Sequence, residues 1–467
     1  MREVPDLSSV FGAMHAASRR DQLPPWQVRA ERLQRLRRLV TANHDAIAAA
    51  IHADFGNRPA QETALLEVFP SLAAIDDALK HGRRWMRERC ARTGIWFRPG
   101  KSRLVPQPLG VVGIVVPWNY PLYLTVGPVA GALAAGNRVM VKLSEYTPRF
   151  AGLFAQLAQS AFAPDELVVV NGDASVAADF TALPFDHLLF TGSTQVGHHV
   201  MRAAAANLTP VTLELGGKSP AILGPGADLA RAASRILAGK LLNAGQTCIA
   251  PDYVLLPEGM RDAFVTHARQ AVDKLYPALA SNPDYTSIIS PRHFGRLTSL
   301  LDEAQARGAR VAPLSDAPPD AQARRLPPVL LLDVPPDTAV MQEEIFGPLL
   351  PVVTYRTVDE AIAFVNARPR PLALYLFEQR RDAVDHVMRQ TVAGGVTVND
   401  TLLHIAQDDL PFGGVGASGM GAYHGKAGFE TFSKLKPVFH QSRLNGAALL
   451  SPPYGERFRK MIRLLLR

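Results

Sequence analysis

The most reactive side chain of the sequence belongs to Cys248, one of only two cysteines in 467 residues. The segment NAGQTC at 243–248 contains Gly245, which lets the backbone bend just before the thiol. A thiol presented on such a turn is a candidate nucleophile. Taken alone, a buried structural cysteine is the more common occurrence. The neighbouring motifs must therefore decide between the two interpretations.

Two further polar residues lie in apolar surroundings. Glu214 lies between two leucines and before two glycines, and burial there raises a carboxyl pKa and makes a general base for neutral pH. An ion pair with Lys218 or a backbone cap is the alternative. Asn119 lies between two prolines in PWNYP, where a rigid amide N–H can stabilise an oxyanion. A plain turn is the alternative for this segment.

A glycine-containing turn at 190–197, FTGSTQVG, follows an apolar run. It lacks the G-x-G-x-x-G pattern of dinucleotide-binding turns and is weak evidence by itself. It nevertheless predicts Gly192 and Ser193 at a strand-to-helix junction, where helix N–H groups can bind a phosphate.

The elements that must position these residues follow from the periodicity of the chain. Residues up to about Arg89 have helical spacing, and short apolar runs then alternate with helices, which indicates an α/β fold with a doubly wound parallel sheet. A second alternation starts near Glu214 and ends near Gly395. Apolar runs at 95–97 and 103–105 flank a Pro-Gly turn and predict a hairpin, either an arm for a partner subunit or a surface loop. The expected strands are 111–116, 138–142, 167–170 and 187–191, then 253–256, 328–332 and 349–355, with helices at 127–135 and 149–161.

Composition excludes several classes of protein. Hydrophobic residues make up 47% and charged residues 20% of the chain, which is typical of a globular enzyme of two or three domains. The net charge of +8 comes without any nucleic-acid-binding signature, so we expect no nucleic-acid partner. Two cysteines and no secretory signal favour the cytoplasm. Residues 104–137 carry no charge, but prolines and glycines interrupt them, so we expect no transmembrane segment.

The motifs together resemble the aldehyde dehydrogenase family over essentially the whole chain. PWNYP, FTGSTxxG, LELGGKSP, NAGQTC, EEIFGP at 343–348 and PFGGVGASGMG at 411–421 occur in the order found in that family. GQTCIAPDYVL and the segment from LPFGG to LKPVF are similar to its class 3 and fatty-aldehyde branch. VNDTLLHIAQDDLPFGG adds a similarity to bacterial coniferyl aldehyde dehydrogenases.

The resemblance implies roles for individual residues. Cys248 would attack the aldehyde, Asn119 and the Cys248 N–H would hold the oxyanion, and Glu214 would activate water, with Glu344 as the alternative base. The cofactor would be NAD, with NADP as the alternative, since Glu145 disfavours a 2′-phosphate while class 3 relatives often accept both. Its implied contacts are Trp118, Lys142, Ser144, Glu145, Gly192, Ser193, Gly197, Leu215, Glu344 and Phe346. No metal site is expected.

The resemblance also implies the organisation of the chain. An NAD(P)-binding domain would comprise 1–91 and 107–213, a catalytic domain 214–395, a bridging and oligomerisation element 92–106 and 431–441, a return segment lining the active site 396–430, and a C-terminal tail 442–467. We expect a homodimer that oxidises an aromatic aldehyde such as coniferyl aldehyde. The alternatives are a medium- or long-chain aliphatic aldehyde, a non-catalytic relative, and a thiol hydrolase. The basic amphipathic tail helix would pack on the protein or on its partner, or contact a membrane surface.

Overall fold

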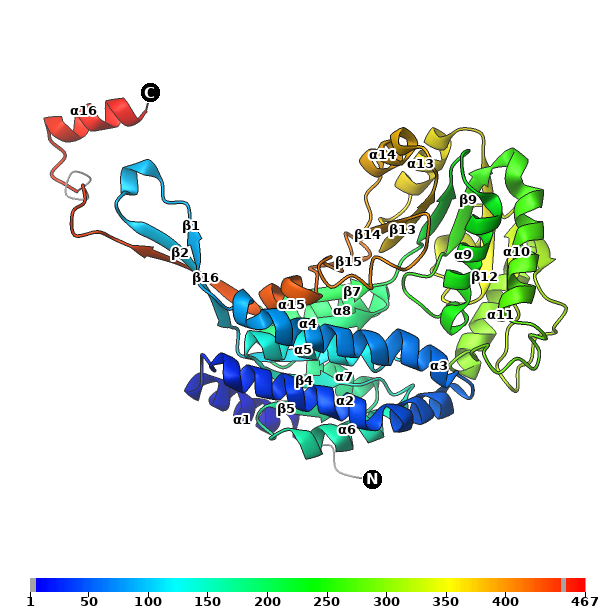
Figure 1. The fold of residues 1–467 in the computed structure, drawn as a ribbon, viewed down its shortest axis with the longest axis horizontal. Coiled ribbons are helices and arrows are strands. Elements are labelled where there is room, and N and C mark those ends of the chain that lie inside the picture. The colour runs from blue at the N-terminus through cyan, green and yellow to red at the C-terminus, as the bar shows by residue number, and fades with distance from the viewer. Residues whose placement is uncertain (1–5, 447–450, 467) are drawn as a thin grey trace.

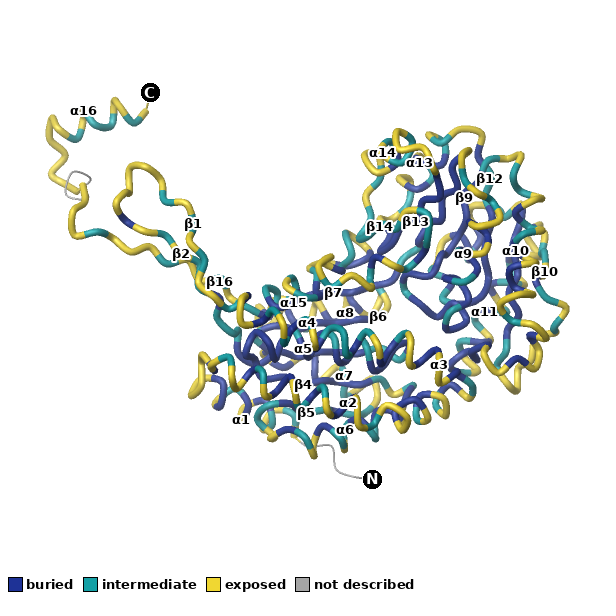
Figure 2. Tube along the Cα trace, viewed as in Figure 1, coloured by how far each residue is buried: buried dark blue, intermediate teal, exposed yellow. Residues whose placement is uncertain are grey.

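The computed structural model describes residues 6–446 and 451–466, which form two large sheets covered by helices and a small antiparallel sheet that projects from them. The projecting sheet forms an arm that ends beside the C-terminal helix α16 (Glu456–Leu465) (Figure 1). Most of the arm is exposed, whereas the strands of the large sheets are buried (Figure 2). None of the described helices is both long and apolar enough to cross a membrane.

The six-stranded sheet has the order β15-β7-β6-β3-β4-β5 and is parallel apart from β15. Side chains alternate between its two faces: Val112 and Ile114 pack into the core that includes the long helix α2 (Trp26–Phe55), and Val111 and Val115 into the core that includes α1 (Leu7–Arg20). Burial on both faces explains why these strands are continuous apolar runs. The strands are β3 (Val111–Val115), β4 (Arg138–Lys142), β5 (Leu167–Val170), β6 (His187–Gly192), β7 (Val211–Leu215) and β15 (Gly419–Met420).

Helices surround this sheet on both faces. The expected helices at 127–135 and 149–161 are confirmed, with the first one beginning a turn earlier. Besides α1 and α2, the main ones are α4 (Phe69–Trp85), α5 (Tyr123–Ala135), α6 (Pro148–Ala161), α7 (Ala174–Thr181) and α8 (Thr194–Ala205).

The second sheet has seven strands in the order β10-β11-β12-β9-β8-β13-β14, all parallel except β10. It contains the three expected strands near 253–256, 328–332 and 349–355. The strands are β8 (Pro220–Leu223), β9 (Tyr253–Pro257), β10 (Arg310–Pro313), β11 (Val329–Leu332), β12 (Leu349–Tyr355), β13 (Ala373–Phe377) and β14 (Gly395–Val398). Their main helices are α9 (Leu229–Leu241), α10 (Arg261–Leu275), α11 (Pro291–Ala306), α12 (Ala339–Gln342), α13 (Val358–Asn366) and α14 (Arg381–Gln390).

The arm corrects the expected hairpin. Its strands are β1 (Arg89–Ala91), β2 (Lys101–Pro108) and β16 (Ser433–His440), and β2 pairs with both of the others. Ile95–Phe97 is a 3-10 turn instead of a strand. The Phe97 N–H bonds back to the Gly94 carbonyl, so this segment satisfies its backbone locally and leaves three large side chains exposed. The prediction was wrong because it relied on the apolar composition of these three residues. They form a short turn between Gly94 and Pro99.

Candidate active site

Cys248 follows a turn with unusual backbone geometry. Helix α9 ends at Leu241, and Asn243, Ala244 and Gly245 then have φ of 53°, 52° and 80°. Such angles are free for glycine but cost the other two residues about 1–3 kcal/mol each, so the surroundings must hold them. An added Cβ at Gly245 would lie 2.4 Å from the Gly347 carbonyl oxygen, which leaves glycine as the residue that fits. The turn thereby presents a half-buried, unpaired thiol.

Burial, together with the nearby carboxyl groups of Glu344 and Glu214, raises the pKa of the Cys248 thiol to about 12. Backbone N–H groups of Cys248 and Ile249 act in the opposite direction. The thiol is therefore protonated at neutral pH in this state. Formation of the nucleophilic thiolate requires a neighbouring base to take the proton.

Glu214 is one of the two buried carboxyl groups that act on the thiol. It lies on β7, beside Thr191 of β6 and Gly419 of β15, and is only 2% exposed. Among the described residues neither carboxyl oxygen has a hydrogen-bond partner. Burial raises its pKa well above the ordinary value.

The ion pair between Glu214 and Lys218 is absent from the described structure. The Lys218 ammonium instead contacts the Asp252 carboxylate and donates to the carbonyls of Val340 and Glu343, each at 2.8 Å. Lys218 therefore clamps the segment that leads to Glu344, and the Glu214 carboxyl group remains available for chemistry.

Asn119 lies against the nucleophile turn, although it is 127 positions away from Gln246 in the sequence. Its side chain is buried, and Nδ2 donates to the Gln246 carbonyl at 3.2 Å. The Asn119 carbonyl accepts hydrogen bonds from Arg58 Nη1 at 2.9 Å and from Asn243 Nδ2 at 3.0 Å. The amide has a second hydrogen, which can donate to a ligand.

Apart from Glu344 and Phe346, the predicted cofactor residues follow the carboxyl ends of β3, β4, β6 and β7. The chain runs outward through β3, β4 and β5 and returns to β6 beside β3, so the order of strands reverses between β3 and β6. Dinucleotides bind at such a switch point in open α/β sheets. Ser193 follows Gly192 and caps helix α8 by accepting from the Val196 N–H at 3.3 Å. Gly197 lets the helix approach Leu215, which a Cβ would meet at 2.7 Å.

Lys142 ends β4 and is 1% exposed. Its ammonium donates to the carbonyls of Leu143 at 2.7 Å and Gly172 at 2.8 Å, which leaves one of its three hydrogens for a ligand. Burial lowers its pKa, and Glu145 opposes that effect. Glu145 is exposed, and Ser144 beside it accepts from the Tyr146 N–H at 3.3 Å.

Glu344 and Phe346 come from the segment before β12, and Phe346 meets Trp118, which follows β3. The rings of Trp118 and Phe346 meet edge to face at 5.4 Å. Glu344 Oε1 is buried without a hydrogen-bond partner among the described residues, and burial raises the pKa of this carboxyl to about 8. A Cβ on Gly216 would lie 1.9 Å from Glu344 Oε2, so this close approach requires glycine. Three features together fit a dinucleotide: the unpartnered oxygen of Glu344, the N-terminus of α8 behind Ser193, and the free ammonium hydrogen of Lys142.

Sequence reasoning missed the buried groups behind these loops. Arg58, Glu62 and Glu67 form an ion cluster, and Arg58 is fully buried. The i, i+4 spacing of Arg58 and Glu62 was a usable signal, although it usually marks a solvated helix face. Tyr423 was also missed: it is buried, and Glu214 and Cys248 both contribute to its raised pKa after burial itself.

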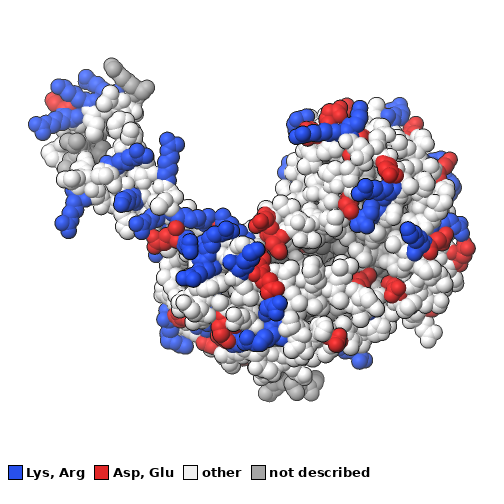
Figure 3. Space-filling model, viewed as in Figure 1, with Lys and Arg blue, Asp and Glu red and all other residues white. Residues whose placement is uncertain are grey.

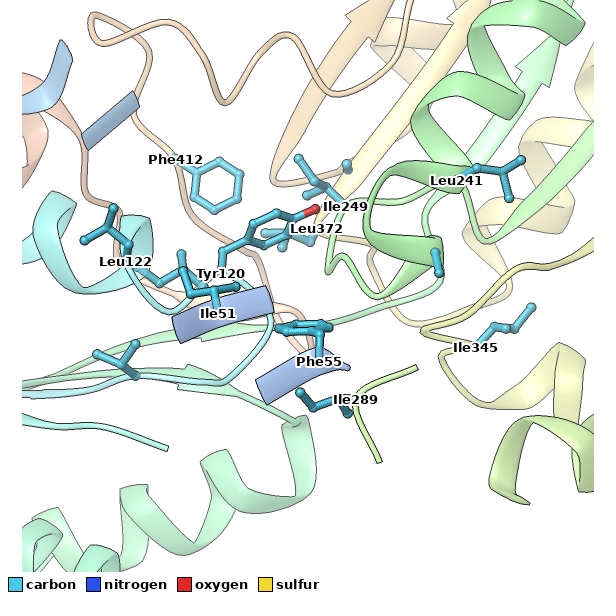
Figure 4. Close-up of a cluster of buried hydrophobic side chains, with 14 of the residues drawn as sticks. Ile51, Phe55, Tyr120, Leu122, Leu241, Ile249, Ile289, Ile345, Leu372 and Phe412 are labelled. Atoms are coloured by element: carbon cyan, nitrogen blue, oxygen red, sulfur yellow. The ribbon is translucent and has the colours of Figure 1, made fainter. Parts of the chain in front are cut away.

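Apolar side chains surround the loops of the site. Figure 4 shows Tyr120 and Phe412 grouped with Ile249 and Leu372, with Phe55 nearby. Tyr120 is tied to the nucleophile turn because its hydroxyl lies 2.6 Å from Thr247 Oγ1.

Comparisons with known proteins agree with this geometry. The aldehyde dehydrogenase family model matches residues 4–438. A probable coniferyl aldehyde dehydrogenase of Pseudomonas aeruginosa is 51% identical over 461 residues, covering 99% of this chain and 96% of that protein. The coniferyl aldehyde dehydrogenase of a Pseudomonas species is 49% identical and covers 94% of this chain and 92% of its own.

A solved structure gives the same result for the fold. Staphylococcus aureus AldH in its substrate-bound state matches with a TM-score of 0.93 at 39% identity, covering 98% of this chain and 99% of that chain. The chain belongs to the aldehyde dehydrogenase family, whose members oxidise aldehydes with NAD(P)+.

Proposed function

We propose that the protein oxidises an aromatic aldehyde, such as coniferyl aldehyde, to the carboxylic acid through a thioester on Cys248. The observation that carries this proposal is the unpartnered, buried carboxyl group of Glu214, which contributes to the raised pKa of the Cys248 thiol. Burial raises the pKa of the Glu214 carboxyl group, which makes its carboxylate a stronger proton acceptor. The names of the relatives support the aromatic substrate.

The reaction begins when Glu214 takes the proton of Cys248 and the thiolate adds to the aldehyde carbonyl. The Asn119 side-chain amide and the Cys248 backbone N–H stabilise the oxyanion of the resulting thiohemiacetal. Bound NAD(P)+ supplies the hydride acceptor, and loss of hydride leaves a thioester on Cys248. Glu214 gives that first proton up to solvent and then takes a proton from the water that attacks the thioester. The bond between carbon and Sγ breaks, the acid is released, and Glu214 returns the proton to the Cys248 thiolate, which restores the thiol.

Dinucleotide binding uses residues of the switch point. Ser193 and the N-terminus of α8 suit the pyrophosphate, and Lys142 and Glu145 suit the adenosine ribose. Glu344 and Phe346 suit the nicotinamide riboside. An exposed carboxylate at Glu145 repels a 2′-phosphate, which favours NAD over NADP.

We also propose that the arm joins two copies into a homodimer. Its exposed apolar side chains include Trp96 at 67% and Phe439 at 47% exposure. Lys and Arg side chains also gather on the arm and at its base (Figure 3). Trp96→Asp is expected to shift the mass in light scattering from dimer to monomer, and an unchanged dimer would contradict this role.

A panel of aldehydes tests the substrate. Coniferyl aldehyde, benzaldehyde, decanal and acetaldehyde are compared by kcat/KM with NAD+ and NADP+. We expect coniferyl aldehyde and NAD+ to give the highest value and Cys248→Ala to abolish turnover. A preference for decanal would favour the aliphatic alternative. Ester hydrolysis without any aldehyde-dependent NADH formation would favour a thiol hydrolase.

A further inference from the structure

The ion cluster of Arg58, Glu62 and Glu67 lies behind both reactive loops. Arg58 follows helix α2, Glu62 lies on α3 (Ala60–Thr63), and Glu67 lies on the π-helical segment η1 (Ala64–Val68). Their exposed fractions are 0%, 8% and 0%. Burial of three ionisable groups is a weak way to stabilise a fold, because apolar side chains of similar volume do as well or better. The cluster therefore calls for another explanation.

One side of the cluster holds the oxyanion loop. Arg58 Nη1 lies 2.9 Å from Glu67 Oε1 and donates to the Asn119 carbonyl at 2.9 Å. Glu67 Oε2 accepts from the N–H groups of Leu122 at 2.6 Å and Tyr123 at 3.3 Å, where α5 begins. Arg58 thereby holds Asn119 itself, and Glu67 holds the residues that follow it.

The other side of the cluster holds the nucleophile turn. Arg58 Nε lies 3.5 Å from Glu62 Oε1, and Glu62 Oε2 accepts from the Asn243 N–H at 3.1 Å. Glu62 Oε1 also accepts from Thr286 Oγ1 at 2.9 Å. Glu62 thereby holds the strained turn at Asn243, which leads directly to Cys248, and Arg58 acts on this turn through its ion pair with Glu62.

We propose that Arg58 is a positioning residue that sets the separation between the Asn119 amide and the Cys248 thiol. This inference rests on the roles given above to Asn119 and Cys248. A guanidinium has a planar fork that can face two carboxylates and a carbonyl at once, whereas a lysine ammonium is a single point charge. Arg58 also lies 4.9 Å from the ring centroid of Tyr120, which is bonded to Thr247.

A double-mutant cycle tests the proposal. Arg58→Met is made in the wild-type and Asn119→Ala backgrounds, and the NADH burst rate is measured in single turnovers at saturating NAD+. We expect about a 10²-fold loss in the wild-type background, since misplacement of reacting groups by about 1 Å costs this much. We expect a further loss of less than about 3-fold in the Asn119→Ala background, because the two residues act through the same contact. Equal losses in both backgrounds would overturn the proposal.

Arg32→Met is the matched control. Arg32 is buried and pairs with Glu166 at 2.9 Å, away from the reactive loops. We expect it to lower the melting temperature while the burst rate stays within about 3-fold of wild type, since distant sites act independently. Equal slowing by Arg32→Met would overturn the assignment, since any lost buried arginine would then have the same effect.

Arg58→Lys covers the case in which Arg58→Met fails to fold. Lysine keeps the positive charge but lacks the planar guanidinium group that can face several acceptors. We expect about a 10-fold slower NADH burst with unchanged NAD+ affinity. A wild-type burst in Arg58→Lys would overturn the proposal. Asn119→Ala alone tests the proposed function separately, because its own burst reports the oxyanion role without any change at Arg58.

Discussion

Replacement of Glu214 by glutamine gives the sharpest test of the proposed base. The amide has nearly the same volume as the carboxyl group but cannot take a proton. Because neither carboxyl oxygen has a hydrogen-bond partner among the described residues, Glu214→Gln breaks no bond that the structure shows. Loss of a positioned general base lowers rates by about 10²–10⁴-fold, which corresponds to about 3–5 kcal/mol of activation free energy.

Although Glu214→Gln should lose activity, its thermal stability should stay the same or rise. Burial raises the pKa of Glu214, so the folded protein binds a proton more tightly than the unfolded chain does. The protonated carboxyl group therefore contributes to the free energy of unfolding. This contribution is fully present below the pKa of Glu214 in the unfolded chain and is lost as the pH rises through its pKa in the folded protein. We therefore expect Glu214→Gln to melt at the same or a higher temperature than wild type under mildly alkaline conditions.

The assay separates the two proton transfers assigned to Glu214. A normal NADH burst followed by slow turnover means that the base serves thioester hydrolysis, and a slow burst means that it also activates the thiol. Glu344→Gln is the comparison with the alternative base, since Glu344 is a second carboxyl group with a raised pKa of about 8. It is assayed at saturating NAD+, because Glu344 is also assigned to cofactor binding. Steady-state turnover of Glu214→Gln within about 3-fold of wild type would refute the role of Glu214, since a general base contributes far more than that.

Three further predictions follow from the geometry and the ionisation of buried groups. In the protein without cofactor, alkylation of Cys248 by iodoacetamide should rise about tenfold per pH unit between neutrality and its thiol pKa of about 12; a plateau near neutral pH would contradict that value. Gly216→Ala should displace Glu344 and weaken NAD+ binding by at least about tenfold in calorimetry, because the new Cβ would lie 1.9 Å from Oε2; unchanged affinity would exclude Glu344 as a cofactor contact. Burial lowers the pKa of His187 from 6.5 to about 4. Between these two pH values the unfolded chain binds more protons than the folded protein. The free energy of unfolding should therefore fall by about 3 kcal/mol as the pH drops from 6.5 to 4. Denaturant unfolding of His187→Gln should show a weaker fall, and an identical pH profile would contradict the assignment.

Much of the fold could be predicted because buried parallel strands leave a clear pattern. The runs at 111–116 and 138–142 are apolar on both faces, and helices cover both faces of their sheet. The error at Ile95–Phe97 arose where exposed apolar residues imitate a strand, since composition does not reveal that a 3-10 turn satisfies the backbone locally.

The site was harder to assemble from the sequence. The alternative pairing of Glu214 with Lys218 was excluded only when the structure placed the Lys218 ammonium on Asp252. Arg58 escaped notice because its bond to Asn119 joins residues that lie 61 positions apart in the chain. Long-range contacts of this kind have no local signature in a single sequence.

Peptide mass spectrometry of the trapped intermediate examines the covalent step itself. Glu214→Gln protein is mixed with coniferyl aldehyde and NAD+, quenched in acid and digested. We expect an acyl adduct on the Cys248 peptide, with the mass of the aldehyde less two hydrogens, in step with one NADH per active site. Formation of NADH and acid with no adduct on Cys248, or with the adduct on Cys90, would contradict covalent catalysis by Cys248.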